Sequence, residues 1–295
     1  MDRANPLPRK RVLLGTGAFL LALMLIGSIW DFPISKAVYN PGSPFGLFFA
    51  GFGEYPAALG FAAAGTMLLS ARNREKRLVS VLQIIGGCWF VLSGAAMAVM
   101  LPKGYLDIST VLSVGIGMFC TALTVWGVAR LCRGADRHTV IRVAAVFLLV
   151  IFADILVVNL IKIPWGRARM RLIAVDDRAY FMPWWQPGKS LRDTLVAAGV
   201  AAEEFKSFPS GHTANASSLM LLCLLPQLSP KSAGKQTALF LIGFFWTSLV
   251  AASRIVMGAH YLTDTIVGFA AGLLMLAGLC RILFPIHRKM PEAKA

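Results

Sequence analysis

The chain has 295 residues, of which 57% are hydrophobic, 15% are charged and 27 residues are glycine, and its mean hydropathy is +0.68. A soluble domain is only about 45–50% apolar, and a folded sphere of this size has no interior large enough to hide the excess. The composition therefore excludes a soluble, disordered, collagen-like or disulfide-rich secreted protein, and it indicates an integral membrane protein.

Apolar segments long enough to cross a bilayer, about 20 residues each, recur along the chain. We predict an all-α fold, a polytopic transmembrane helical bundle of about eight spans. The sixth span is the weakest, because it is short, contains Pro226 and begins with polar residues. The expected spans are 12–30, 47–69, 78–101, 110–129, 143–161, 213–228, 237–257 and 261–284.

Lysine and arginine (29 residues) outnumber aspartate and glutamate (14 residues), for a formal net charge of +15. In a soluble protein this surplus suggests a nucleic-acid partner, whereas cytoplasmic loops of membrane proteins retain Lys and Arg. With both termini in the cytoplasm, most basic residues fall on the cytoplasmic face, so we expect no nucleic-acid partner. The two ends of the chain contribute Arg3, Arg9, Lys10, Arg11, Arg281, Arg288, Lys289 and Lys294 to that face.

A basic cluster lies on the expected outer face, where the preference of Lys and Arg for cytoplasmic loops does not explain it. Lys162, Arg167, Arg169 and Arg171 lie within ten residues at the end of the fifth expected span. Arg offers forked donors and Lys a point charge to phosphate oxygens, so a pocket for a multiply charged anion needs such residues. A solvated loop that contacts lipid headgroups is an equally good interpretation of this segment alone.

The tetrapeptide Pro209–His212 lies at the start of the sixth expected span. Pro and Ser210 suit a helix start, Gly211 lets the backbone approach a ligand, and free N–H groups at a helix N-terminus bind anions. His212 has a titratable proton suited to general-acid catalysis. A capped helix start without catalytic function is the alternative.

The third motif, Ser253-Arg254-x5-His260-x3-Asp264, surrounds the expected outer turn between the last two spans. The four-residue spacing of His260 and Asp264 is typical of one helical face, where a carboxylate fixes the imidazole tautomer and leaves the other nitrogen free to attack. Arg254 lies in an apolar segment, where an unpaired charge is costly and usually functional. A purely structural His–Asp hydrogen bond is the alternative.

All three motifs map to span ends on one membrane face, so three helices can converge on one site. Here the chain resembles the type 2 phosphatidate phosphatase superfamily of membrane lipid phosphatases. That family carries Lys-x6-Arg-Pro, Pro-Ser-Gly-His and Ser-Arg-x5-His-x3-Asp in this order, and residues 160–265 of this chain keep the order and spacings. Met170 stands where the family usually has proline.

The resemblance implies phosphoryl transfer through a phosphohistidine. It implies that His260 is the nucleophile, that Asp264 orients it, and that His212 protonates the leaving oxygen and then activates water. Phosphoryl transfer needs charge stabilisation and positioning, which fixed cations can supply. We therefore expect neither a metal nor a cofactor. The implied phosphate-binding residues are Lys162, Arg169, Ser210, Gly211 and Arg254, with Arg171 as an additional candidate contact.

Two acids, Glu54 and Asp154, lie inside expected spans, each about 10 Å from the outer end at 1.5 Å per residue. One hypothesis places them, with Asn159, beneath the cationic site. An interhelical hydrogen bond with no part in turnover is the alternative. The aromatic residues at 180–185 suggest an outer loop that lies on the bilayer surface, followed by a short surface helix over 191–206.

We thus expect N-terminal transmembrane helices without catalytic motifs at 1–142, a catalytic helical core with an outer loop at 163–208 within 143–284, and a cytoplasmic tail at 285–295. The expected activity is hydrolysis of a lipid phosphate or polyprenyl diphosphate at the outer face of the plasma (inner) membrane. A lipid phosphotransferase with the same site, and a non-enzymatic anion or lipid transporter, are alternatives. The sequence does not identify the lipid or the oligomeric state.

Overall fold

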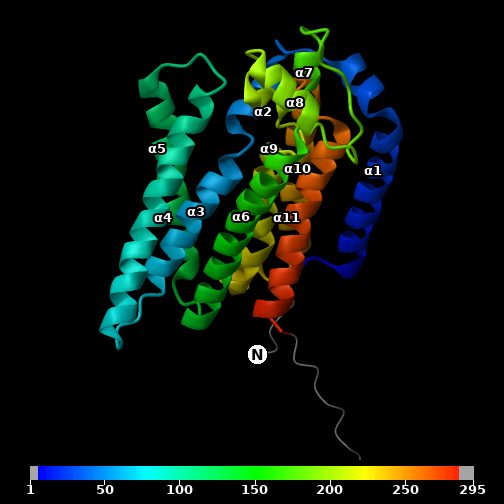
Figure 1. The fold of residues 1–295 in the computed structure, drawn as a ribbon. Coiled ribbons are helices and arrows are strands. Elements are labelled where there is room, and N and C mark those ends of the chain that lie inside the picture. Colours follow the sequence, from blue (N-terminus) through cyan, green and yellow to red (C-terminus); the bar gives the residue numbers. More distant parts are fainter. Residues whose placement is uncertain (1–5, 286–295) are drawn as a thin grey trace, which may run out of the picture.

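The computed structural model describes residues 6–285, and every regular element in this part of the chain is helical (Figure 1). The all-α prediction is therefore confirmed for these residues. Arg3 and the expected tail from residue 286 on lie outside them. The helices are α1 (Lys10–Val38), α2 (Pro44–Phe52), α3 (Tyr55–Ser70), α4 (Arg77–Lys103), α5 (Thr110–Cys132), α6 (Arg137–Trp165), α7 (Met170–Ile173), α8 (Lys189–Ala197), η1 (Ala202–Phe205), α9 (Gly211–Ser217), η2 (Ser218–Gln227), η3 (Pro230–Ser232), α10 (Gln236–Val256) and α11 (Leu262–Leu283).

Seven helical units of the described residues are long and apolar enough to cross a membrane. The segment expected as the sixth span, 213–228, is not among them, because it forms the short helix α9 followed by the 3₁₀ helix η2. It still runs through the bundle, in contact with α6, α10 and α11. The seven units are Lys10–Val38, Pro44–Ser70, Arg77–Lys103, Thr110–Cys132, Arg137–Ile173, Gln236–Val256 and Leu262–Leu283.

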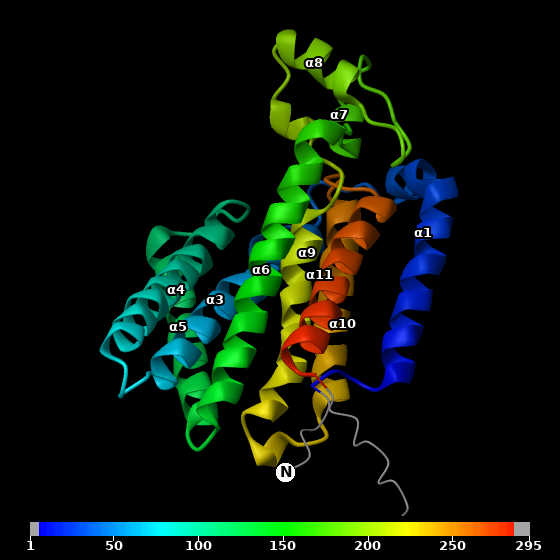
Figure 2. The same cartoon turned by 60° about the horizontal axis from the view of Figure 1, so that its bottom comes forward.

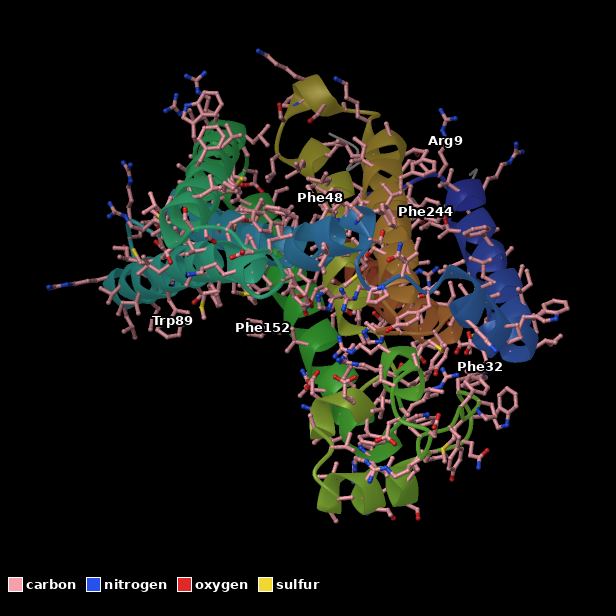
Figure 3. The ribbon with its side chains drawn as sticks, turned by 90° about the horizontal axis from the view of Figure 1, so that it is seen from above. Arg9, Phe32, Phe48, Trp89, Phe152 and Phe244 are labelled. Atoms are coloured by element: carbon pink, nitrogen blue, oxygen red, sulfur yellow. The ribbon has the colours of Figure 1, made fainter. Side chains whose placement is uncertain are left out.

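The helices form a central group, with α1 on one side and α3 with the α4–α5 hairpin on the other (Figure 1). Helices α6, α9, α10 and α11 pack together, α1 lies against α11, and α3 connects the group to the α4–α5 hairpin (Figures 1 and 2). Seen from above, the hairpin extends away from the central helices as a separate arm (Figure 3). Helix α1 begins and α11 ends at the end of the bundle opposite α7 and α8 (Figure 1).

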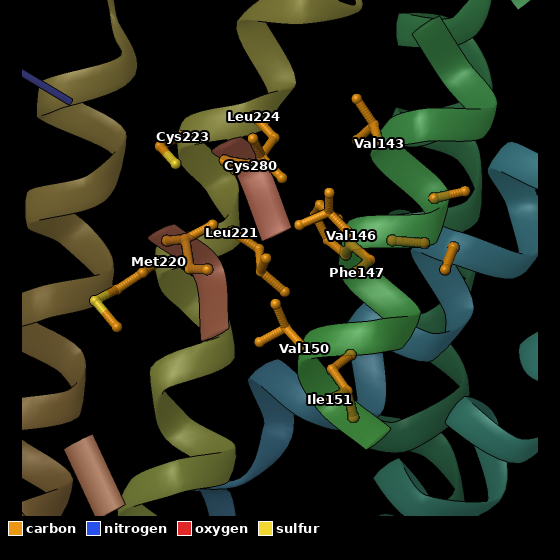
Figure 4. Close-up of a cluster of buried hydrophobic side chains, with 14 of the residues drawn as sticks. Val143, Val146, Phe147, Val150, Ile151, Met220, Leu221, Cys223, Leu224 and Cys280 are labelled. Atoms are coloured by element: carbon orange, nitrogen blue, oxygen red, sulfur yellow. The ribbon is translucent and has the colours of Figure 1, made fainter. Parts of the chain in front are cut away.

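Side chains of α6 and η2 form the main apolar core. Val146, Phe147 and Val150 of α6 face Leu221 and Leu224 of η2 (Figure 4). Within a membrane, such packing is held by dispersion contacts and close backbone approach rather than by the exclusion of water. The η2 segment is therefore fixed in the bundle even though its helix is short.

Helices α3 and α4 approach each other through glycine. A Cβ on Gly65 would meet the carbonyl oxygen of Gly87, and a Cβ on Gly87 would meet that of Gly65. Small residues of this kind let two membrane helices pack with their backbones in contact. The α4–α5 hairpin is held against α3 by this close packing.

The expected second span is broken into α2 and α3. The break falls at Glu54, whose backbone (φ −90°, ψ 0°) is not helical, and Pro56 stands in the first turn of α3. Proline at that place cannot donate the hydrogen bond that would continue α2. The break turns the chain at the level of the first turn of α9, which it contacts through Glu54.

The 163–208 loop folds over the end of the bundle with a small core of its own, which includes Leu172, Leu191, Leu195 and Phe205. The expected single helix at 191–206 is wrong, because α8 ends at Ala197 and Gly199 adopts a left-handed conformation (φ +93°) that breaks the helix. The loop is fastened to the bundle by Trp184, whose Nε1 donates to Ser28 Oγ of α1 at 2.9 Å, and by the stacking of Trp165 on Phe208 at 4.8 Å.

Candidate active site

The predicted motifs meet around one cavity of about 480 Å³ between α6, α9, α10 and the α4–α5 loop. Seven of the predicted residues line it, whereas Ser210 and Asp264 do not. The predicted lining residues are Lys162, Arg169, Arg171, Gly211, His212, Arg254 and His260, and Glu54, Tyr105, Asp154, Ile155, Val158, Asn159, Glu203 and Asn215 complete the wall.

His260 is buried, with 1% of its surface exposed, and its ring is held by a backbone group. Its Nδ1 lies 2.5 Å from the carbonyl oxygen of Ser207. A carbonyl oxygen can only accept, so Nδ1 carries the proton and Nε2 keeps its lone pair. Burial lowers the pKa of His260 well below its ordinary value, and the positive charges of Lys162, Arg169 and Arg254 lower it further. The ring is therefore neutral, with an unprotonated Nε2.

The expected direct hydrogen bond between Asp264 and His260 is not formed, because their nearest side-chain N and O atoms are 4.0 Å apart. The four-residue spacing places two residues on one face only within a helix, and α11 begins at Leu262, after His260. Asp264 instead accepts hydrogen bonds from Ser207 Oγ at 2.5 Å and from Tyr261 N at 2.8 Å. It thus fixes the segment whose carbonyl holds His260.

Arg167, which the sequence analysis placed in the basic cluster, does not line the cavity. It is fully buried and binds Asp31 of α1 at 2.9 Å and Asp264 of α11 at 2.5 Å. Its Nε donates to the carbonyl oxygen of Met182 at 2.8 Å. Buried charges require such pairing, so Arg167 joins the first and last helices to the loop. Asp31 was not recognised from the sequence, because nothing local distinguishes it from other residues at a span end.

Two arginines present incompletely paired guanidinium groups to the cavity. Arg254 is 3% exposed, and its Nε and Nη1 have no hydrogen-bond partner among the described residues. Arg169 is 7% exposed; its Nη2 donates to Glu203 at 2.9 Å, while its Nε has no partner there. Buried unpaired cations are costly unless an anion completes them. The cavity therefore holds guanidinium donors that a charged, oxygen-rich anion can satisfy.

Lys162 and Arg171 contribute differently to the cavity. A Cβ built on Gly211 would lie 3.3 Å from Lys162 Nζ, which places the ammonium beside the N-terminus of α9. Arg171 makes two hydrogen bonds to Glu204, at 2.8 and 2.6 Å. Nε and Nη2 of Arg171 are thus both paired, whereas Nε of Arg169 and of Arg254 has no partner among the described residues.

The Ser210 side chain serves the helix rather than the cavity. It is fully buried, and its Oγ accepts from Thr213 N at 3.3 Å as the N-cap of α9. Accepting this bond leaves the O–H of Ser210 free to donate, so the expected contact between Ser210 and phosphate stays a prediction. Gly211, by contrast, presents its backbone to the cavity.

His212 also lines the cavity, and side chains from the N-terminal half of the chain contact it. Its Nε2 lies 3.6 Å from Glu54 Oε2, and its ring packs edge-on against Tyr105 at 5.4 Å between centroids. Asn215 donates to Glu54 Oε1 at 2.7 Å. Tyr105 was missed because a single tyrosine in a short loop carries no sequence signal.

Asp154 and Asn159 also line the cavity, and the hypothesis that they lie beneath the cationic site stays a prediction. Asp154 is fully buried. Asn159 Nδ2 donates to the carbonyl oxygen of Ile155 within α6 at 2.7 Å. Among the described residues, no group of three or more His, Cys, Asp and Glu side chains lies close enough together to hold a metal ion.

The fold is that of a multi-pass helical membrane protein, and its cavity is lined by two histidines and several cationic side chains. Residues 143–288 match the model of the PAP2 superfamily, and through this part the chain belongs to that superfamily of phosphatases. The predicted relationship to type 2 phosphatidate phosphatases is thereby confirmed. No curated protein and no solved structure matches the chain.

Proposed function

We propose that this protein is a metal-independent lipid phosphatase that hydrolyses a lipid phosphate or diphosphate through a phosphohistidine at the outer face of the plasma membrane. The observation that carries the proposal is the free Nε2 of His260 within a cavity that also contains the incompletely paired guanidinium groups of Arg169 and Arg254. An activated nucleophile beside fixed cations is what phosphoryl transfer requires.

In the first step, His260 Nε2 attacks phosphorus, the bond from phosphorus to the lipid oxygen breaks, and His212 gives its proton to that oxygen. In the second step, water attacks the phosphohistidine, the N–P bond breaks, and His212 takes the proton of the water. The cations Lys162, Arg169 and Arg254 hold the equatorial oxygens throughout. The Nδ1–H of His260 stays on the Ser207 carbonyl, which keeps the reacting nitrogen aimed at the cavity.

A lipid substrate fits the surroundings of the cavity. Ile155 and Val158 of α6 give one wall of the cavity an apolar surface that continues along a membrane-spanning helix. Exposed aromatic side chains on the 163–208 loop, including Tyr180 and Trp185, suit the headgroup region of a bilayer. The outer-face assignment rests on the distribution of Lys and Arg in the sequence.

The test is phosphate release by purified full-length protein from phosphatidate, phosphatidylglycerol phosphate, a lipid A-type phosphate and a polyprenyl diphosphate, with EDTA present. We expect release from at least one lipid, and its loss in His260→Ala. Activity that survives His260→Ala contradicts the assignment of His260 as the nucleophile. Activity that EDTA abolishes and Mg²⁺ restores contradicts metal independence, and phosphate passed to an added alcohol instead of water indicates a transferase.

A further inference from the structure

We infer that Glu54 is the positioning residue of His212, and that its carboxylate holds the imidazole in place and stabilises the protonated form that the proposed reaction uses. This inference rests on the proposed function. Glu54 lies outside residues 143–288, which match the superfamily, so the N-terminal part of the chain supplies an essential group to the site.

Each of the two carboxylate oxygens of Glu54 has its own contact. One carboxylate oxygen, Oε2, faces His212 Nε2 at 3.6 Å, and the other, Oε1, accepts from Asn215 Nδ2 at 2.7 Å. His212 and Asn215 are three residues apart on α9 and therefore share one face of that helix. The break between α2 and α3 places Glu54 against this face. A single carboxylate thus bridges two residues of the helix that carries the expected general acid.

The charges around His212 explain why it needs an acidic partner. Burial lowers the pKa of His212 well below its ordinary value, and Arg254 of α10, Lys162 of α6 and Arg169 lower it further. A hydrogen bond with the backbone of Ala50 raises the pKa of His212, but by less than any one of these effects lowers it. These surroundings oppose the protonated imidazole that must donate to the leaving oxygen.

Three carboxylates line the cavity, but only that of Glu54 has a contact with His212. Glu203 pairs with Arg169 and with Lys206, each at 2.9 Å. Asp154 lies on α6, two turns before Lys162, and makes no ion pair with His212. A negative group beside an imidazole raises its pKa by about one to three units, which offsets part of the effect of the three cations.

In the inferred cycle Glu54 acts as a carboxylate in both steps, and the hydrogen bond from Asn215 and the nearby cations Arg254 and Lys162 favour this form against the effect of burial. The His212 proton goes to the lipid oxygen in the first step, and the proton of water returns to the same nitrogen in the second. Glu54 neither gains nor loses a proton overall. It stabilises the imidazolium at the start and end of the cycle, as the carboxylate of a catalytic triad does.

The test compares Glu54→Gln with wild type and with Asp107→Asn. Gln keeps the shape of the side chain and an oxygen for Asn215, and it removes the charge. Asp107 is exposed on the loop that carries Tyr105, so Asp107→Asn removes the same charge without a contact to His212. Two readouts are measured: the pH dependence of kcat and KM, and the pKa of His212 from NMR of the histidine-labelled protein in detergent.

In Glu54→Gln we expect kcat to fall about 10–100-fold with little change in KM, and the basic limb of the kcat profile to move to lower pH by about one unit or more. The NMR titration of His212 should move in the same direction, and Glu54→Asp should restore part of the rate. Asp107→Asn should behave as wild type. In a His212→Ala background, Glu54→Gln should cause no further loss of rate.

A His212 titration that is unchanged in Glu54→Gln overturns the inference, whether or not the enzyme is active. Equal losses from Glu54→Gln in the wild-type and His212→Ala backgrounds also overturn it. Failure of the proposed function looks different, because wild type then releases no phosphate from any lipid while the NMR comparison still gives its answer.

Discussion

The ring of Tyr105 lies over the guanidinium of Arg254, with 5.5 Å between the ring centroid and Cζ. The two residues come from different parts of the fold, since Tyr105 is in the α4–α5 loop and Arg254 is near the end of α10. The same ring also contacts His212. The α4–α5 hairpin, which carries no family motif, therefore covers two residues of the proposed phosphate site.

We expect Tyr105→Ala to raise KM several-fold, because a cation–π contact contributes about 0.5–2 kcal/mol and the ring also limits access of water to Arg254. Tyr105→Phe keeps the ring and should stay within about twofold of wild type, since a phenyl face attracts cations nearly as well. The measurement is KM for the preferred lipid, together with inhibition by inorganic phosphate. Equal losses in the two variants would assign the effect to the hydroxyl instead.

The pH optimum of kcat/KM should lie on the acidic side of the ordinary histidine pKa of about 6.5. His260 must be neutral to attack, and because its pKa is lowered, the acid limb of the profile falls below that value. The pKa of His212 is lowered as well, so the basic limb moves the same way. A kcat/KM profile of the free enzyme with its acid limb at or above pH 6.5 would contradict the neutral-nucleophile assignment.

Asp264→Asn should destabilise the protein as well as inactivate it. The substitution leaves Arg167 buried beside only one carboxylate, and breaking a buried pair costs about 3–5 kcal/mol. It also loosens Ser207, whose carbonyl holds His260. The measurement is thermal unfolding in detergent, with kcat determined below the transition.

Asp31→Asn is the comparison for that experiment. It removes the other carboxylate of Arg167 but does not contact Ser207. We expect a similar loss of stability with a smaller loss of kcat at low temperature. If Asp264→Asn unfolded at the wild-type temperature, the ion pair would have no structural importance.

Gly211→Ala should lower kcat/KM several-fold without changing the unfolding temperature. The added Cβ would lie 3.3 Å from Lys162 Nζ, which must then shift by a few tenths of an ångström. Gly86→Ala in α4 is the control, because a Cβ there meets nothing within 4 Å. A Gly211→Ala enzyme with unchanged KM and kcat would show that Lys162 binds phosphate from another position.

The sequence was sufficient for the helical class and for the family, because both depend on local patterns. Apolar segments of bilayer length can be recognised directly in the sequence, and each of the three motifs lies within a single segment. The weakest expected span, 213–228, is also where the helix departs from regular α geometry. Pro226 and the polar start of this segment were the sequence signals of that departure.

The contacts between motifs could not be predicted in the same way. Glu54 and His212 are 158 residues apart, and the carboxylate reaches the ring only because the chain breaks between α2 and α3. The partner of His260 is a backbone carbonyl. Because every residue has a carbonyl group, the sequence does not show which one holds the ring. The His260–Asp264 spacing indicated a helical face, but the helix begins two residues too late for that pattern to apply.

The Arg167 contacts have a consequence for biogenesis. Arg167 lies 136 residues after Asp31 and 97 residues before Asp264, so its two carboxylates are at opposite ends of the chain. During synthesis, Asp31 enters the bilayer long before its neighbour in the finished bundle exists, and such distant pairings form late. The contacts of α1 with Arg167 and with α11 can therefore form only after the ribosome has synthesised those later segments.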